Sequence, residues 1–136
     1  MSPSEPQRMY ELLVDGFQQV SGILDERKST LAADPVLAEL ADRVAAAPDP
    51  ESDEVKRAFL HALDSRELSA AAEVVQYFAH RFRWAWLHAE VEQRHLDCLT
   101  RVDRRLTRHY ERMLEAFSPD WEDRDLFPSL AKHSSP

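Results

Sequence analysis

The sequence predicts an all-α fold, either a single-domain bundle or a short α-α repeat array of about six to seven helices. Apolar residues recur at steps of three and four through most of the chain, which is the period of an amphipathic helix. Only two glycines occur in 136 residues, and both lie inside such stretches. No alternating apolar run is flanked by an Asn-Gly, Asp-Gly or Gly-Gly turn. We therefore expect strand content near zero.

Length and composition are those of one folded domain, which we place at residues 1–136 with flexible tails at 1–4 and 131–136. The first residues are Ser, Pro and Glu rather than basic and then apolar, and no stretch approaches the ~20 apolar residues that cross a bilayer. We expect a cytoplasmic protein without a membrane partner. Cys98 is the single cysteine, so no internal disulfide can form. Fourteen of the seventeen cationic residues are Arg, which indicates a GC-rich bacterial genome.

The first half of the chain predicts three helices. An apolar stripe over 5–30 predicts the first, 35–47 the second and 51–64 the third. Three helix starts are marked by a capping residue before proline, because proline lacks the N–H that the first helical position leaves unbonded: Asp34-Pro35, Asp49-Pro50 and Ser118-Pro119. The last of these starts a short acidic helix over 119–127, which we expect to dock through Trp121, Leu126 and Phe127.

Residues 69–117 contain neither Gly nor Pro, so the sequence alone permits one very long helix. Such a rod could not bury its apolar stripe in a chain of this size, and the stripe drifts near Arg83 and near Thr100. We therefore expect two breaks there, the second at a capping box formed by Thr100 and Asp103. The apolar positions assigned to this stripe are Val74, Val75, Phe78, Phe82, Leu87, Val91, Leu99, Val102, Leu106, Tyr110, Met113 and Phe117.

The segments Leu60-His61-Ala62-Leu63-Asp64-Ser65 and Glu67-Leu68-Ser69-Ala70-Ala71-Ala72-Glu73-Val74-Val75 resemble α-helical repeat proteins of the HEAT class over about one repeat. The resemblance implies a scaffold that binds partners on a helical surface. No second copy at a fixed period follows in the sequence, so a plain helical bundle is the alternative fold.

One histidine cluster predicts an alternative function. His88, Glu92 and His95 have the spacing of metal ligands on one helix face, which would make the chain a metal-binding helical bundle and perhaps an enzyme. The motif occurs once, whereas ferritin-like bundles use Glu-x-x-His on two helices. His95 and Cys98 lie one turn apart, but the chain has no glycine-rich loop to build an oxyanion hole. Our main expectation is therefore a protein without catalytic residues, metal or cofactor.

Charge is distributed unevenly along the chain. Residues 80–112 contain eight Arg and five acidic residues, whereas the rest contains nine cationic and twenty acidic residues. Arg101, Arg105, Arg108 and Arg112 recur at helical spacing and form one stripe. The overall charge of −8 disfavours nucleic acid. We predict a protein-protein interaction module that binds an acidic protein surface through this stripe.

Trp84 and Trp86 are flanked by arginines and are candidate anchors of the same interface, since Trp and Arg are enriched at binding hot spots. Three alternatives stay open. The arginines could pair with acids on neighbouring helices, the tryptophans could pack in the core, and a small ligand could bind between helices. Pairing of acidic and basic regions between two copies would give a homodimer.

Overall fold

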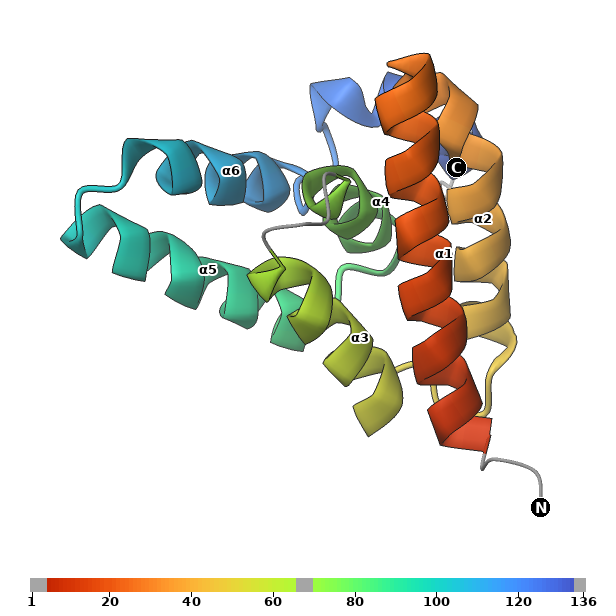
Figure 1. Ribbon diagram of the computed structural model, residues 1–136. Coiled ribbons are helices and arrows are strands. Elements are labelled where there is room, and N and C mark those ends of the chain that lie inside the picture. Colours follow the sequence, from red (N-terminus) through yellow and green to blue (C-terminus); the bar gives the residue numbers. More distant parts are fainter. Residues whose placement is uncertain (1–4, 66–69, 134–136) are drawn as a thin grey trace. The chain divides into compact units, whose positions relative to one another are not determined.

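A computed structural model describes residues 5–65 and 70–133 of the chain. Over these residues the fold contains six α-helices, two short 3-10 helices and no strand (Figure 1). The all-α prediction is therefore confirmed. None of the helices in the described part of the chain is long and apolar enough to cross a bilayer. The elements are α1 (Glu5–Arg27), α2 (Thr30–Ala46), α3 (Asp53–Asp64), α4 (Ala71–Phe82), α5 (Ala85–Thr100), α6 (Arg104–Glu115), η1 (Glu122–Leu126) and η2 (Pro128–His133).

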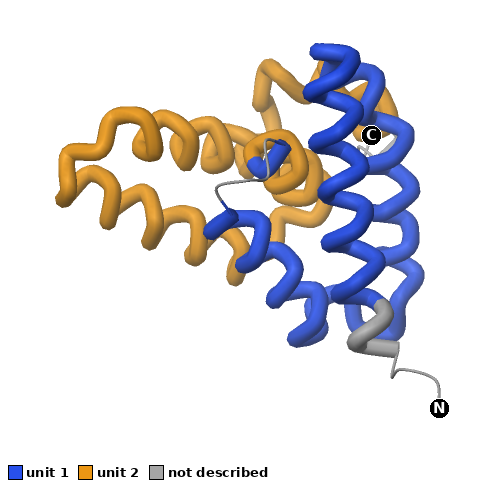
Figure 2. The backbone as a smooth tube through the Cα atoms, in the orientation of Figure 1, with its two compact units in different colours: residues 1–71 blue, residues 72–136 orange. Residues whose placement is uncertain are grey.

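The chain divides into two compact units, residues 1–71 and 72–136 (Figure 2). In the first unit, α1 packs against both α2 and α3. Phe17 of α1 and Phe59 of α3 are fully buried, with ring centroids 5.3 Å apart. Leu37 and Val44 of α2 are also buried. They lie seven residues apart, on the same face of the helix. These positions follow the period of 3.6 on which the prediction of three helices rests.

In the second unit, α5 and α6 pack against each other as an antiparallel hairpin (Figure 1). Helix α4 is joined to the C-terminal elements by polar contacts to backbone and side chain. Gln76 Nε2 donates to the carbonyl of Arg112 at 2.8 Å, and His80 Nδ1 lies 3.0 Å from the carbonyl of Ala116. The hydroxyls of Tyr77 and Ser129 are 2.7 Å apart.

The proline signals misplace the helix starts. Helix α2 begins at Thr30, with Ser29 as its N-cap, so Pro35 lies inside the helix instead of opening it. The earlier start extends the buried face of α2 back to Ala33, and this burial offsets the backbone bond that proline cannot make. Helix α3 begins three residues after Pro50, because Ser52 caps it by accepting from the Val55 N–H at 3.4 Å.

The C-terminal segment also differs from its prediction. Residues 119–127 form a turn and the 3-10 helix η1 rather than an α-helix. Trp121 and Phe127 are buried, as expected, whereas Leu126 is exposed. The backbone of residues 128–133 forms η2, so residues 131–133 are helical and not part of a tail as predicted. Residues 1–4 and 134–136, which we also predicted to be tails, and residues 67–69 of the repeat-like segment lie outside the described residues.

Both breaks predicted within residues 69–117 are confirmed, so this segment forms three helices. Arg83 ends α4 with a left-handed backbone, φ 51°. The capping residue at the second break is different from the one predicted. Asp103, not Thr100, caps α6 by accepting from the Leu106 N–H at 3.1 Å. Thr100 remains in α5, where its hydroxyl donates to the carbonyl of Leu96.

Candidate interaction surface

Helices α5 and α6 pack against each other, and each buries apolar side chains. Leu87, Val91 and Cys98 of α5 are buried, as are Tyr110 and Met113 of α6. Cys98, the single cysteine, is therefore part of the buried face of α5. Because these residues fix the spacing of the two helices, they also fix the position of the connection between them. We call residues 96–105, which end α5, make the turn and begin α6, the hairpin tip.

The turn at the hairpin tip has the hydrogen bonds of a Schellman motif. The N–H of Asp103 donates to the carbonyl of Cys98 at 3.0 Å, and the N–H of Val102 donates to that of Leu99 at 3.2 Å. This motif places Val102 in the left-handed region, with φ 56°. Glycine is usual at this position, because a β-branched side chain is strained there. The hairpin tip therefore carries local backbone strain.

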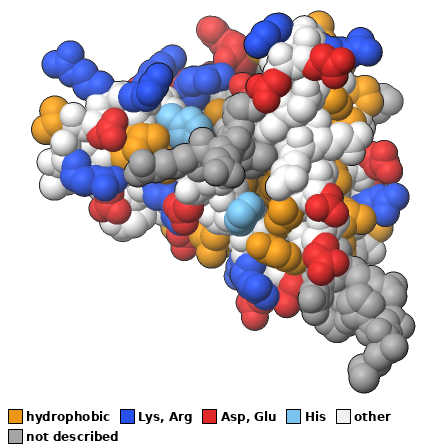
Figure 3. Space-filling model, in the orientation of Figure 1, with side chains coloured by type: hydrophobic (Ala, Val, Ile, Leu, Met, Phe, Trp, Pro, Cys, Tyr) orange, Lys and Arg blue, Asp and Glu red, His pale blue; other side chains and the backbone are white. Residues whose placement is uncertain are grey.

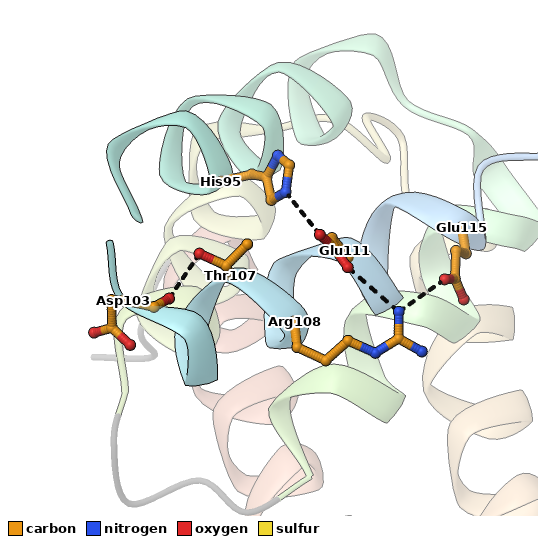
Figure 4. Close-up of polar contacts among 6 residues, drawn as sticks. All are labelled: His95, Asp103, Thr107, Arg108, Glu111 and Glu115. Atoms are coloured by element: carbon orange, nitrogen blue, oxygen red, sulfur yellow. Dashed lines mark hydrogen bonds and ion pairs between the residues drawn. The ribbon is translucent and has the colours of Figure 1, made fainter. Parts of the chain in front are cut away.

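The arginine stripe predicted from the sequence divides into two halves. Arg108 contacts Glu111 at 3.3 Å and Glu115 at 3.4 Å on its own helix (Figure 4). Arg112 contacts Glu73 of α4 at 3.6 Å. Arg112 thus pairs with an acid on a neighbouring helix, as the alternative interpretation of the stripe expected, whereas Arg108 pairs with acids of its own helix.

The other half of the stripe lies at the hairpin tip and is exposed. Arg101, the C-cap of α5, and Arg105 make no ion pair within the described residues, nor does their neighbour Arg104. Arg104 was missed in the sequence because it falls outside the spacing of four, three and four residues. Its position next to the Asp103 cap could not be identified before the cap itself was known.

Three large apolar side chains of the hairpin tip are also exposed. Leu96 is 57% exposed, Leu99 49% and Val102 75%. The prediction that Leu99 and Val102 belong to the buried stripe was therefore wrong. Leu99 lies one residue after Cys98, about 100° around α5 from its buried face, and Val102 lies in the Schellman turn, outside both helices. In Figure 3, cationic and hydrophobic side chains occur together at this end of the hairpin.

The two tryptophans proposed as anchors belong to an aromatic cluster. Trp84 is only 6% exposed and stacks on Phe82, with ring centroids 4.7 Å apart and planes 8° apart. Trp86 is half-buried and stacks on Trp84 at 5.5 Å. Trp84 therefore packs as a core residue and is not part of the exposed surface.

The structure brings together two of the three residues of the predicted metal motif, His88 and Glu92, and pairs the third, His95, with a different acid. His88 Nδ1 lies 3.0 Å from Glu92 Oε1 one turn along α5. His95 instead approaches Glu111 of α6, with 3.6 Å between Nε2 and Oε1 (Figure 4). Among the described residues, no group of three or more His, Cys, Asp or Glu side chains is placed to hold a metal ion.

The first unit contains two hollows next to His61. One of about 420 Å³ is lined by Tyr10, Arg57, Leu60, His61, Asp64 and Ser65. Arg57 lies over the Tyr10 ring there, 5.1 Å from its centroid. The other, of about 440 Å³, lies along α1 and includes Ser21 and Asp25. Ser21 Oγ accepts from the Ala70 N–H at 3.1 Å, so this hydroxyl is used within the fold.

Comparisons with protein-family models, curated proteins and solved structures found no match. The resemblance to HEAT-class repeats therefore gains no support from them.

Proposed function

We propose that the chain is a non-enzymatic interaction module that binds another protein through the basic hairpin tip. The observation that carries the proposal is the exposure of Arg101, Arg104 and Arg105 without an acidic partner in the described residues. The chain has 25 acidic and 17 cationic residues, so carboxylates for internal pairing are abundant. Arg108 and Arg112, on the same helix, do use them.

The electrostatics of α6 support a role outside folding for these arginines. The amino end of a helix carries a partial positive charge, which favours acidic residues in the first turn. Helix α6 has one acid at its amino end, the cap Asp103, and its first turn has no acid and begins with Arg104 and Arg105. These cations oppose the helix dipole, and they stand beside the strained Val102. Local features that lower stability without an internal benefit are typical of functional sites.

A protein partner is favoured over nucleic acid by the charge of the whole chain. The sequence has a net charge of −8 and a pI near 5.2, so its long-range field repels a polyanion. Three guanidinium groups are a small basic footprint beside the broad patch that nucleic-acid binding uses. They are enough for charge-assisted hydrogen bonds to a few carboxylates of an acidic protein surface.

The test is capture of partners from a lysate of the native host with and without nuclease. The variant Arg101→Glu, Arg104→Glu and Arg105→Glu reverses the basic hairpin tip. The control Arg27→Glu, Lys28→Glu and Arg43→Glu changes the charge equally at exposed positions of the first unit. We expect the wild type and the control, but not the hairpin-tip variant, to retain the same protein after nuclease treatment.

Two results would contradict the proposal. Equal retention by the hairpin-tip variant would show that these arginines do not bind the partner. Retention that disappears on nuclease treatment would identify a nucleic acid instead. Circular dichroism of each variant checks that helicity is unchanged.

A further inference from the structure

Among the residues that the structure describes, the large exposed apolar side chains are concentrated at the hairpin tip. Five large hydrophobic side chains are exposed in the described part of the chain, and three of them are Leu96, Leu99 and Val102. The other two, Leu31 and Leu126, are far from this segment in the sequence. Single exposed hydrophobic residues are normal on a protein surface, whereas a group of them marks an interaction site.

The apolar and basic residues of the hairpin tip alternate along the chain. Leu96 and Leu99 lie one turn apart on α5, and Arg101 separates Leu99 from Val102. Asp103 then caps α6, and Arg104 and Arg105 follow it. A ligand that covers this surface must therefore present apolar groups and negative charges within about one helical turn of each other, or about 5 Å.

An acidic amphipathic helix has this combination of groups. Its apolar side chains recur at steps of three and four, and carboxylates flank the apolar stripe. Nucleic acid would supply phosphates, but its bases stack on aromatic side chains, and Trp84 is buried. An anionic membrane gains only about 1 kcal/mol from each basic residue near its surface, and the net charge of −8 opposes its approach.

We infer that the hairpin tip binds an acidic amphipathic helix of a partner protein, with Leu96, Leu99 and Val102 against its apolar stripe and Arg101, Arg104 and Arg105 against its carboxylates. This inference rests on the proposed function, because it specifies the partner of the same surface. It adds that charge alone does not hold the complex. The apolar trio must contribute affinity that remains at high salt, because apolar contact is not screened.

A displayed library of random helical peptides provides the probe. Peptides are selected on the wild-type chain and counter-selected on Leu96→Ser, Leu99→Ser and Val102→Ser, which keeps all three arginines. We expect enriched peptides to combine acidic residues with apolar residues at steps of three and four. No enrichment over the counter-selected pool, or enrichment of acidic peptides without an apolar period, would overturn the inference.

The best-enriched peptide is then titrated by fluorescence anisotropy. We expect binding at least about tenfold weaker for the Ser variant and for Arg101→Gln, Arg104→Gln and Arg105→Gln, which is the usual loss at a binding hot spot. The control Leu31→Ser and Leu126→Ser removes the other two exposed hydrophobic residues and should bind like the wild type. Thermal melts confirm that every variant is folded.

The two proposals fail in different ways. If the Ser variant binds normally and the Gln variant does not, the apolar contact is wrong and the basic interaction surface stands. If lysate capture is unchanged by reversal of the three arginines, the proposed function fails. Tighter binding of duplex DNA or of phosphatidylglycerol vesicles than of the peptide overturns the inference. So does dimerisation in sedimentation that the Ser variant abolishes, because the occupant would then be a second copy.

Discussion

At the scale of single residues, Val102 is the position where the local conformation and the side chain disagree most. Its φ of 56° belongs to the left-handed region, and the side chain is branched at Cβ and exposed. We predict that Val102→Gly raises the free energy of unfolding by about 1 kcal/mol, because glycine has no Cβ to clash in this conformation. Urea denaturation of both proteins measures the change.

The control for this prediction is Val102→Ala, which removes the branched side chain but keeps a Cβ. We expect it to recover less stability than glycine does. An equal gain from alanine would assign the effect to the exposed apolar surface rather than to the backbone. The glycine variant should also bind the acidic peptide more weakly, since it lacks one of the three apolar contacts.

His80 gives a prediction about pH. Burial lowers the pKa of its imidazole below the ordinary value of 6.5, and the charges of Arg83 and Arg124 lower it further, against the raising effect of the Ala116 and Ser118 carbonyls. The unfolded chain therefore takes up a proton at a higher pH than the folded chain does. The contribution of His80 to stability is therefore fully present above pH 6.5. It is lost as the pH drops from there toward the pKa of His80 in the folded chain.

Urea denaturation between neutral and mildly acidic pH measures this loss. His80→Gln keeps an N–H donor for the Ala116 carbonyl and cannot titrate, so we expect its stability to change less over that range. His109 has a pKa lowered by burial and by Arg112, with an opposing effect of Glu73, and contributes a loss of the same sign. If His80→Gln and the wild type lose the same stability, His80 is not the source.

At the scale of elements, the sequence predicted the existence of the helices more accurately than the residues at which they begin and end. The periodic stripes located α1 to α6 because burial of one face requires that period whatever the neighbours are. The ends depended on which side chain caps, and several candidates stood close together. Ser52 rather than Asp49, and Asp103 rather than Thr100, makes the capping hydrogen bond. No sequence pattern distinguishes between these candidates.

The two glycines of α1 make a matched pair. A Cβ on Gly22 would meet no atom within 4 Å, whereas a Cβ on Gly16 would lie 2.6 Å from both terminal carbons of Leu40. We predict that Gly22→Ala stabilises the chain by about 1 kcal/mol through helix propensity. Gly16→Ala should lose this gain and more, because overpacking against the buried Leu40 costs about 1–3 kcal/mol.

Thermal denaturation of the two variants under the same conditions compares them. Equal stabilisation by both would mean that α1 and α2 separate at Gly16 without cost. The first unit depends on the close approach of these helices, so we expect the two variants to differ in sign.

Helix α6 offers a test of whether stability is exchanged for binding. Arg104→Glu and Arg105→Glu place two acids in the first turn, where the helix dipole favours them by about 0.5 kcal/mol each. We therefore predict a variant that is more stable than the wild type in urea and no longer binds the acidic peptide. A variant that is both destabilised and unable to bind would indicate that these arginines stabilise the fold.

At the scale of the whole molecule, the sequence located the candidate surface only in part. Arg101 and Arg105 belonged to a visible stripe, but nothing in their spacing separated them from Arg108 and Arg112, which pair with acids. That distinction depends on which carboxylates the fold brings near. The apolar half of the hairpin tip could not be predicted, because periodicity assigns Leu99 and Val102 to the core until the turn between α5 and α6 is known.

The net charge of −8 should affect how fast the partner binds rather than how long it stays. An acidic helix approaches against the field of the whole chain, whereas its dissociation is governed by the contacts at the hairpin tip.

Glu11→Gln, Asp15→Asn and Glu26→Gln remove three exposed negative charges from α1. We predict that this variant associates about twofold faster with the acidic peptide at low salt, with an unchanged dissociation rate. Stopped-flow anisotropy measures both rates. The difference should disappear near 0.15 M salt, where the screening length is about 8 Å. A change confined to the dissociation rate would mean instead that α1 takes part in the contact.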